Sequence, residues 1–251
     1  MTSLTKEEAP SIKVAICWPT GGHPKHGFTY DYGQLMAQTA FYAAERRDLD
    51  FCAAVQASSY LHQNRNGLVM GHLRDDAITH FLFLDDDMRF PKDTLLRLLE
   101  RNKEIVGANY TSRGGVPRPM AVKDMTYDKG GESKLLYTYE GSHGCEKVDT
   151  MGLGVTLIMR HVFDSIAFPW FDFNFNMELS RHEGEDTTFF EKARTAGYDV
   201  YVDHDLSKEI GHDGDMTFTM DHAVQFEEEK KNGTFDLHGA AGDDSGHAES
   251  E

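Results

Sequence analysis

Cysteine is scarce in this chain: Cys17, Cys52 and Cys145 are three among 251 residues, and no two of them form a CxxC pair. An odd and scattered set excludes a disulfide-stapled miniprotein and is typical of a reducing compartment. Long apolar runs are also lacking, because no stretch approaches the roughly 18 residues that a membrane span needs, and the first residues are polar. We therefore expect a cytoplasmic protein without a membrane span.

Positive charge is in short supply. The chain has 25 Lys and Arg residues against 42 Asp and Glu residues, which gives a net charge of -17 at pH 7. A field of this sign disfavours binding to a polyanion over a broad face, so nucleic acid is not the default partner. A local basic groove or a divalent cation could still receive a phosphate.

Proline is rare as well, with 7 residues, and 39% of the chain is hydrophobic, so most of it is expected to fold. The polar segment 1–11 is predicted to be a disordered lead-in. Residues 236–251 hold almost only small, polar and acidic residues, which predicts an acidic mobile tail. Residues 12–235 then form a single domain.

Short β-branched or aromatic runs alternate along this domain with amphipathic segments. The patterns predict strands at 12–18, 50–56, 80–84, 105–110, 155–159 and 199–202, and helices at 30–47, from about 65, from Pro91, at 161–167 and at 187–196. Weak periodicity at 111–147 predicts a hairpin or long loops. The alternation indicates an α/β fold with a mostly parallel central sheet, helices on both faces, and a smaller antiparallel part in the second half.

Three consecutive acids, Asp85, Asp86 and Asp87, follow the apolar strand at 80–84. Ligands of a parallel sheet bind at the carboxyl ends of its strands, which is where these acids lie. Neighbouring carboxylates repel one another, and a divalent cation removes that cost. Strand alternation sends Asp85 and Asp87 to one side, as two oxygen ligands for Mg²⁺ or Mn²⁺. The alternative is a solvated turn that complements the N-terminus of the next helix.

Other motifs follow in the same order as in a known family. They are Met151-Gly152-Leu153-Gly154, Pro169-Trp170-Phe171, Gly184-Glu185-Asp186 and Ile210-Gly211-His212. With the acidic strand end, they make residues 12–213 resemble the metal-dependent nucleotide-sugar glycosyltransferases of the GT-A fold, in particular the compact family 2-like members. In that family an Asp-x-Asp motif holds the metal and the donor. The resemblance implies a single GT-A domain, Mn²⁺ or Mg²⁺ as cofactor, and a nucleotide-sugar donor, with a UDP-sugar expected first.

The resemblance also implies a set of donor and metal ligands. The metal would be bound by Asp85, Asp87 and His212, a set acceptable for Mn²⁺. The donor would be contacted by Pro19, Thr20, Arg65, Asp85, Asp86, Arg113, Gly152 and Gly154. Pro19 and Thr20 stand where the family holds the nucleotide base, and the two arginines suit phosphate. The alternative for each arginine is a solvated surface charge.

Two further roles concern the acceptor hydroxyl. Asp186 matches the general base of inverting members, and Glu185 beside it is its rival. Both acids could instead complement the dipole of the helix that begins there, and a retaining enzyme would not use such a base. Trp170 and Phe171 would contact the acceptor by stacking, although an aromatic cluster can equally be core.

The acceptor and two other functions stay open at this point. The hydroxyl could belong to a glycan, to a small molecule or to a hydroxymethylated base in DNA. A sugar nucleotidyltransferase shares the fold but needs a glycine-rich basic loop after the first strand, which the segment 18–27 matches poorly. A non-catalytic, calcium-dependent carbohydrate-binding module is the third reading, and it predicts glycan binding without nucleotide affinity.

Overall fold

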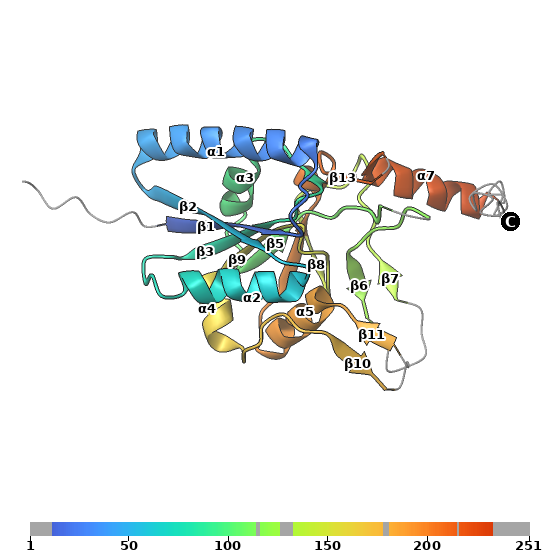
Figure 1. Cartoon of the computed structure of the whole chain (residues 1–251). Coiled ribbons are helices and arrows are strands. Elements are labelled where there is room, and N and C mark those ends of the chain that lie inside the picture. The colour runs from blue at the N-terminus through green and yellow to red at the C-terminus, as the bar shows by residue number, and fades with distance from the viewer. Residues whose placement is uncertain (1–11, 114–115, 126–132, 178–180, 215, 233–251) are drawn as a thin grey trace, which may run out of the picture.

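The computed structural model describes residues 12–113, 116–125, 133–177, 181–214 and 216–232. Its centre is a seven-stranded sheet (Figure 1). In spatial order the strands are β2 (Leu49–Ala57), β1 (Ile12–Thr20), β3 (His80–Leu84), β9 (Val155–Met159), β5 (Ile105–Gly107), β12 (Val200–Asp203) and β8 (Cys145–Val148). β9 runs antiparallel to β3 and β5, and β8 antiparallel to β12, while the other five strands share one direction. The expected mostly parallel sheet is confirmed.

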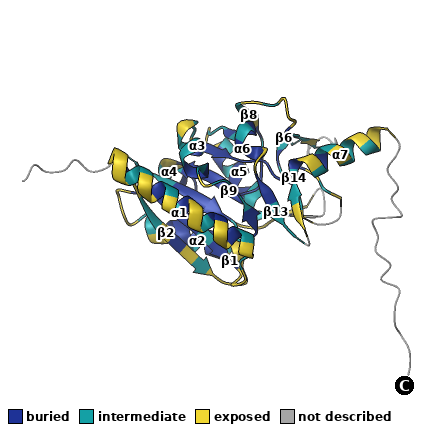
Figure 2. Ribbon diagram, turned by 90° about the horizontal axis from the view of Figure 1, so that it is seen from above, coloured by how far each residue is buried: buried dark blue, intermediate teal, exposed yellow. Residues whose placement is uncertain are grey.

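Helices cover both faces of this sheet, as expected (Figure 1). α1 (His26–Arg46) and α3 (Thr94–Glu100) lie on one face, and α2 (Leu61–His72), α4 (Arg160–Ser165) and α5 (Glu185–Thr195) on the other. The alternation of β3 explains the arrangement, because Leu82 and Leu84 belong to the core cluster under α1 and α3, whereas Phe81 and Phe83 belong to the opposite cluster. Figure 2 shows the buried strands beneath the exposed outer side of α1.

The smaller antiparallel part is also present. It consists of a sheet of β4 (Met88–Arg89), β13 (Gly211–Asp213) and β14 (Thr217–Thr219), and of two hairpins, β6 (Val122–Asp124) with β7 (Lys134–Leu135) and β10 (Asn174–Asn176) with β11 (Arg181–Glu183). The β6–β7 pair confirms the hairpin expected within 111–147.

Several details differ from the sequence-based expectations, since α1 begins at His26 and not at 30, α2 begins at Leu61 and not near 65, and β5 ends at Gly107 and not at 110. The helix expected from Pro91 begins at Thr94, because the Pro91 carbonyl accepts hydrogen bonds from the Thr94 amide and hydroxyl and closes a turn first. No sequence pattern predicts α6 (His204–Ser207) or α7 (Met220–Lys231). α7 buries only Met220 and Ala223 among its described residues, so its apolar face is too narrow for a clear period. The predicted lead-in and tail lie outside the described residues.

In the part of the chain that the structure describes, no helix is long and apolar enough to cross a membrane.

Candidate functional site

The carboxyl ends of β1, β2 and β3 meet at a cavity of about 470 Å³. Its lining includes six residues predicted from the sequence: Pro19, Asp85, Asp86, Asp87, Arg113 and His212. The parallel register explains the convergence, since the loops that follow parallel strands leave the sheet at one edge. Thr20, predicted beside Pro19, is buried at that edge and donates its hydroxyl hydrogen bond to the Asp86 carboxylate.

Asp87 and His212 lie side by side although 124 positions separate them in the sequence. The antiparallel pairing of β13 with β4 sets His212 opposite Met88, and the His212 Nε2 is 3.4 Å from Asp87 Oδ2. The other ring nitrogen, Nδ1, lies 2.7 Å from the Thr111 carbonyl oxygen, to which it can donate. Arg113 also pairs with Asp87. The resemblance implies that Asp87 and His212 meet, because both would bind one metal ion, whereas the contacts with Thr111 and Arg113 were not predicted.

Asp87 and His212 each stabilise the charged form of the other. Burial opposes ionisation of Asp87, but His212 and Arg113 outweigh it and hold the pKa of that carboxyl below its ordinary value. Burial likewise opposes the charge on His212, but Asp87 and the Thr111 carbonyl raise its pKa overall. The arrangement therefore keeps one carboxylate ionised and fixes the tautomer and orientation of one imidazole, as second-shell carbonyls do for metal-bound histidines.

These residues fit a divalent cation in part. A carboxylate oxygen and an imidazole nitrogen held by a backbone carbonyl are suitable ligands for Mn²⁺, which would replace the proton and the Arg113 guanidinium between them. Among the described residues, however, no three Cys, His, Asp or Glu side chains converge on one position. Asp85, the third predicted ligand, is turned to Arg65 instead.

Arg65 is buried with 2% of its side chain exposed, and it joins two acids. Its Nη2 donates to both carboxylate oxygens of Asp85, at 2.7 and 2.8 Å, and its Nη1 pairs with Glu185. The predicted contact of Arg65 with donor phosphates is thus corrected, because the guanidinium is already engaged and does not line the cavity. The same contacts neutralise Glu185, which is a poor candidate for a free base.

Asp186 has a different environment from its neighbour. It lines a second cavity of about 500 Å³ between β6, β7, β11 and the start of α5. Its Oδ1 accepts a hydrogen bond of 2.7 Å from the Thr187 amide. Burial first, and the neighbouring Glu185 second, raise the pKa of Asp186 above its ordinary value. Met120 lines both cavities, so they are adjacent.

Gly152 and Gly154 act through Tyr110. A Cβ atom on Gly152 would collide with the Tyr110 hydroxyl, and one on Gly154 would lie 2.9 Å from it. The Gly154 amide donates a hydrogen bond of 3.1 Å to this hydroxyl, and Tyr110 lines the first cavity. Neither glycine lines that cavity, so the predicted approach of their backbone to a donor is corrected to support of Tyr110.

Trp170 and Phe171 are core residues. Phe171 is fully buried and stacks on Phe189 with ring centroids 4.9 Å apart, and Trp170 is 8% exposed and donates its Nε1 hydrogen to the Phe163 carbonyl. This corrects the prediction that they contact an acceptor. Both rings belong to the same core cluster as Phe189 and Phe190 of α5, and this packing is a tertiary feature that the run 168–175 does not show by itself.

Several residues that line the first cavity were not predicted. They include Tyr110, His23 and Lys25. Lys25 also donates its backbone hydrogen to the Asp86 carbonyl at 2.9 Å, which holds the loop after β1 at the acids. A signal was present in the sequence, because the segment 23–26 gathers cationic and titratable side chains directly after a strand of a strongly acidic chain.

Comparison with known proteins shows the fold only. No protein-family model and no curated protein matches the chain. Among solved structures it is similar to A197 from STIV, with a TM-score of 0.55 and 15% identity over 84% of this chain and 92% of that one. Two weaker likenesses are to GalNAc-T7 with UDP, GalNAc and Mn²⁺ (TM-score 0.45, 8% identity, 80% of this chain and 43% of that one) and to S. aureus TarS with UDP-GlcNAc (0.38, 12%, 77% and 56%). This chain spans less than two thirds of either of the latter.

Proposed function

We propose that this chain is a glycosyltransferase of the GT-A fold that moves a sugar from a nucleotide-diphosphate donor, with a UDP-sugar expected first, to a hydroxyl acceptor. One observation carries the proposal: the cavity at the strand ends, with Asp87, His212 and Arg113, adjoins the cavity that is lined by the partly buried Asp186. A donor and an acceptor need two such neighbouring spaces.

The donor side follows from the charges. Mn²⁺ or Mg²⁺ would be held by Asp87 and His212 and would neutralise charge on the departing diphosphate. Arg113 is half-exposed beside Asp87, so its guanidinium is placed to meet a phosphate at the same cavity. Lys25 adds a second cation to the lining, and Pro19 and Asp86, which line the same cavity, would contact the nucleotide of the donor.

The acceptor side follows from Asp186. Its carboxylate would take the proton of the acceptor hydroxyl while that oxygen bonds to the anomeric carbon. The bond from the anomeric carbon to the diphosphate oxygen breaks, and its electron pair leaves with the diphosphate. A raised pKa suits this role, because a stronger base accepts the proton more readily. Attack from the side opposite the leaving group would invert the anomeric centre.

The test is calorimetric titration of the protein with UDP, GDP, CDP and dTDP, each with Mn²⁺ and with a chelator. We expect one nucleotide to bind only with metal, and Asp87→Ala to weaken that binding by about tenfold or more, which is 1.4 kcal/mol or more. Asp76→Ala is the control, because that side chain is fully exposed. Absence of binding by all four nucleotides would overturn the proposal and favour the calcium-dependent carbohydrate-binding module.

A further inference from the structure

Five ring side chains near the surface form two contact groups, Tyr60–His62–Phe173 and Phe175–His182, which we together call the ring strip. Ring centroids are 6.1 Å apart for Tyr60 and His62, 5.1 Å for His62 and Phe173, and 5.0 Å for Phe175 and His182. Phe173 directly precedes β10 and Phe175 is its central residue, so this short segment of the chain connects the two groups.

The ring strip ends at the proposed acceptor cavity. His182, which pairs with Phe175 across the β10–β11 hairpin, also lines the cavity that holds Asp186. The strip is therefore a surface that leads out of this cavity rather than an isolated patch.

These rings are exposed at some expense in free energy. The exposed fractions are 60% for Tyr60, 51% for Phe173 and 44% for Phe175, and contiguous exposed apolar surface of this kind marks binding sites. Hydrogen bonds from one buried side chain fix the backbone that carries these rings. Buried Asn66 on α2 donates to the carbonyls of His62 and Phe171, at 2.8 and 2.6 Å, and its Oδ1 accepts the amides of Trp170 and Phe171.

The charges on and near the ring strip distinguish between the two classes of ligand that stack on aromatic rings, nucleic acids and sugar chains. None of the five side chains carries a permanent positive charge, Asp172 and Arg181, which adjoin the strip in sequence, have opposite charges, and the whole chain carries -17. A nucleic acid strand needs cations along its backbone as well as rings for its bases, so it is disfavoured. A neutral sugar chain stacks the apolar C–H faces of its rings on aromatic faces and keeps its hydroxyls at the edges, where histidine nitrogens can hydrogen-bond.

We propose that the ring strip binds a neutral oligosaccharide whose terminal sugar enters the cavity of Asp186, so that the acceptor is a glycan chain and not a small molecule or DNA. This inference rests on the proposed transferase function for the meaning of the cavity.

The experiment is calorimetric titration of the full chain with cellohexaose, maltohexaose and chitohexaose, with their disaccharides, and with a short oligothymidylate. Nucleotide and metal are left out, so the result is independent of the nucleotide titration, and failure of one does not imply failure of the other. We expect at least one hexasaccharide to bind more tightly than its disaccharide, and Phe173→Ala/Phe175→Ala to weaken this binding by about tenfold or more.

Phe41→Ala is the matched control, because Phe41 is 63% exposed on α1, which covers the opposite face of the sheet. It should bind the hexasaccharide like the unaltered chain, and thermal unfolding should show both variants folded. Failure of all three hexasaccharides to bind, equal affinity of the double variant and the unaltered chain, or tighter binding of oligothymidylate would each overturn the inference.

Discussion

Glu185 and Asp186 are adjacent acids in the first turn of α5, yet their surroundings give them different chemistry. Glu185 pairs with the buried guanidinium of Arg65, whereas Asp186 faces the second cavity with a single backbone hydrogen bond to one oxygen. A carboxylate held in an ion pair is not free to approach an acceptor hydroxyl, whereas one that lines a cavity is. The geometry thus favours Asp186 over its rival.

At this scale the first prediction concerns Asp186→Asn. Sugar transfer should fall by about 100-fold or more, since general base catalysis contributes at least that much. The measurement is the rate of nucleoside diphosphate release in the presence of the acceptor, followed over pH. Burial raises the pKa of Asp186, and the base must be ionised, so the rate should fall on acidification at a pH above the ordinary aspartate value of about 3.9.

Glu185→Gln serves as the comparison, because it removes a charge next to Asp186 and weakens the pair with Arg65. It should lower the pKa at which the rate falls, since Glu185 is one cause of the raised pKa of Asp186. A loss of rate in Glu185→Gln as large as in Asp186→Asn, with an unchanged pH profile, would contradict the assignment.

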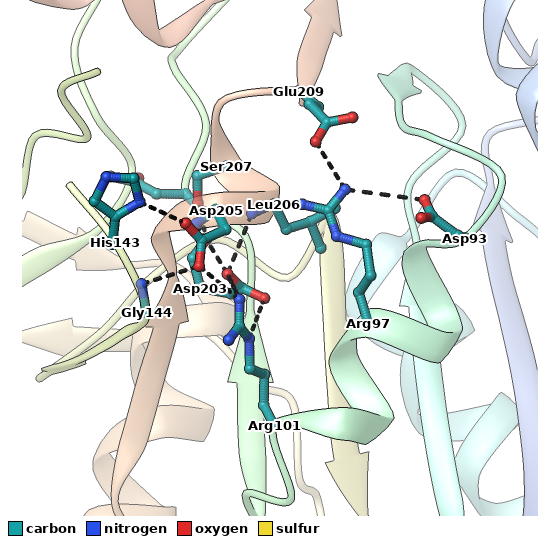
Figure 3. A network of polar contacts seen from close by, with 11 residues as sticks. Asp93, Arg97, Arg101, His143, Gly144, Asp203, Asp205, Leu206, Ser207 and Glu209 are labelled. Atoms are coloured by element: carbon teal, nitrogen blue, oxygen red, sulfur yellow. Dashed lines mark hydrogen bonds and ion pairs between the residues drawn. The ribbon is translucent and has the colours of Figure 1, made fainter. Parts of the chain in front are cut away.

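At the scale of elements, an arginine joins the end of α3 to the end of β12 (Figure 3). Arg101 donates from Nε and Nη2 to the two oxygens of Asp203, at 2.8 and 2.9 Å, and from Nη2 to Asp205. Asp203 is fully buried, and its carboxylate also accepts hydrogen bonds from the backbone amides of Asp205 and Leu206. These two bonds cap the N-terminus of α6. This network holds β12 and the short helix after it in place.

Arg101→Ala should therefore lower the free energy of unfolding by about 3 kcal/mol, because it leaves the buried carboxylate of Asp203 without its cation. Arg97→Ala, on the same helix, should change it by less than about 1 kcal/mol, since the Glu209 side chain that it pairs with is 53% exposed. Denaturation by urea measures both. An equal loss of unfolding free energy in the two variants would show that the burial of Asp203 does not strengthen its ion pair.

The same scale shows what patterns can predict. β3 and β9 begin and end where their apolar runs predict, because such strands are buried on both faces and need continuous apolar residues. α7 and the strands β13 and β14 escape prediction. Each is short or only narrowly buried, so packing against other elements, not local periodicity, stabilises it.

At the scale of the whole molecule, the ion pairs of Arg65 connect segments from both halves of the chain. It lies on α2 in the first half of the chain, and its partners Asp85 and Glu185 follow β3 and begin α5. Burial opposes its charge, but the two carboxylates raise its pKa overall, so it stays ionised. One buried cation therefore connects the strand ends at the first cavity to the helix that carries Asp186.

Arg65→Met should destabilise the molecule by about 3 kcal/mol or more, because two nearby acids would lose their shared cation. Arg46→Ala is the control, since Arg46 is 58% exposed and its pair with Asp48 lies at the surface. Unfolding should be followed by circular dichroism in urea. A stability of Arg65→Met close to that of the unaltered chain would refute the role of Arg65 as a tie.

By itself, the sequence determined the α/β class, the order of the main strands and helices, and the position of Asp85, Asp86 and Asp87 at the end of β3. These follow from local apolar periodicity, which any chain segment carries within itself. Only the tertiary structure decided that His212 is held by the Thr111 carbonyl, that Arg65 pairs with Asp85, and that Trp170 and Phe171 are buried. Each of those outcomes depends on contacts between segments far apart in the chain, and local patterns contain no information on such contacts.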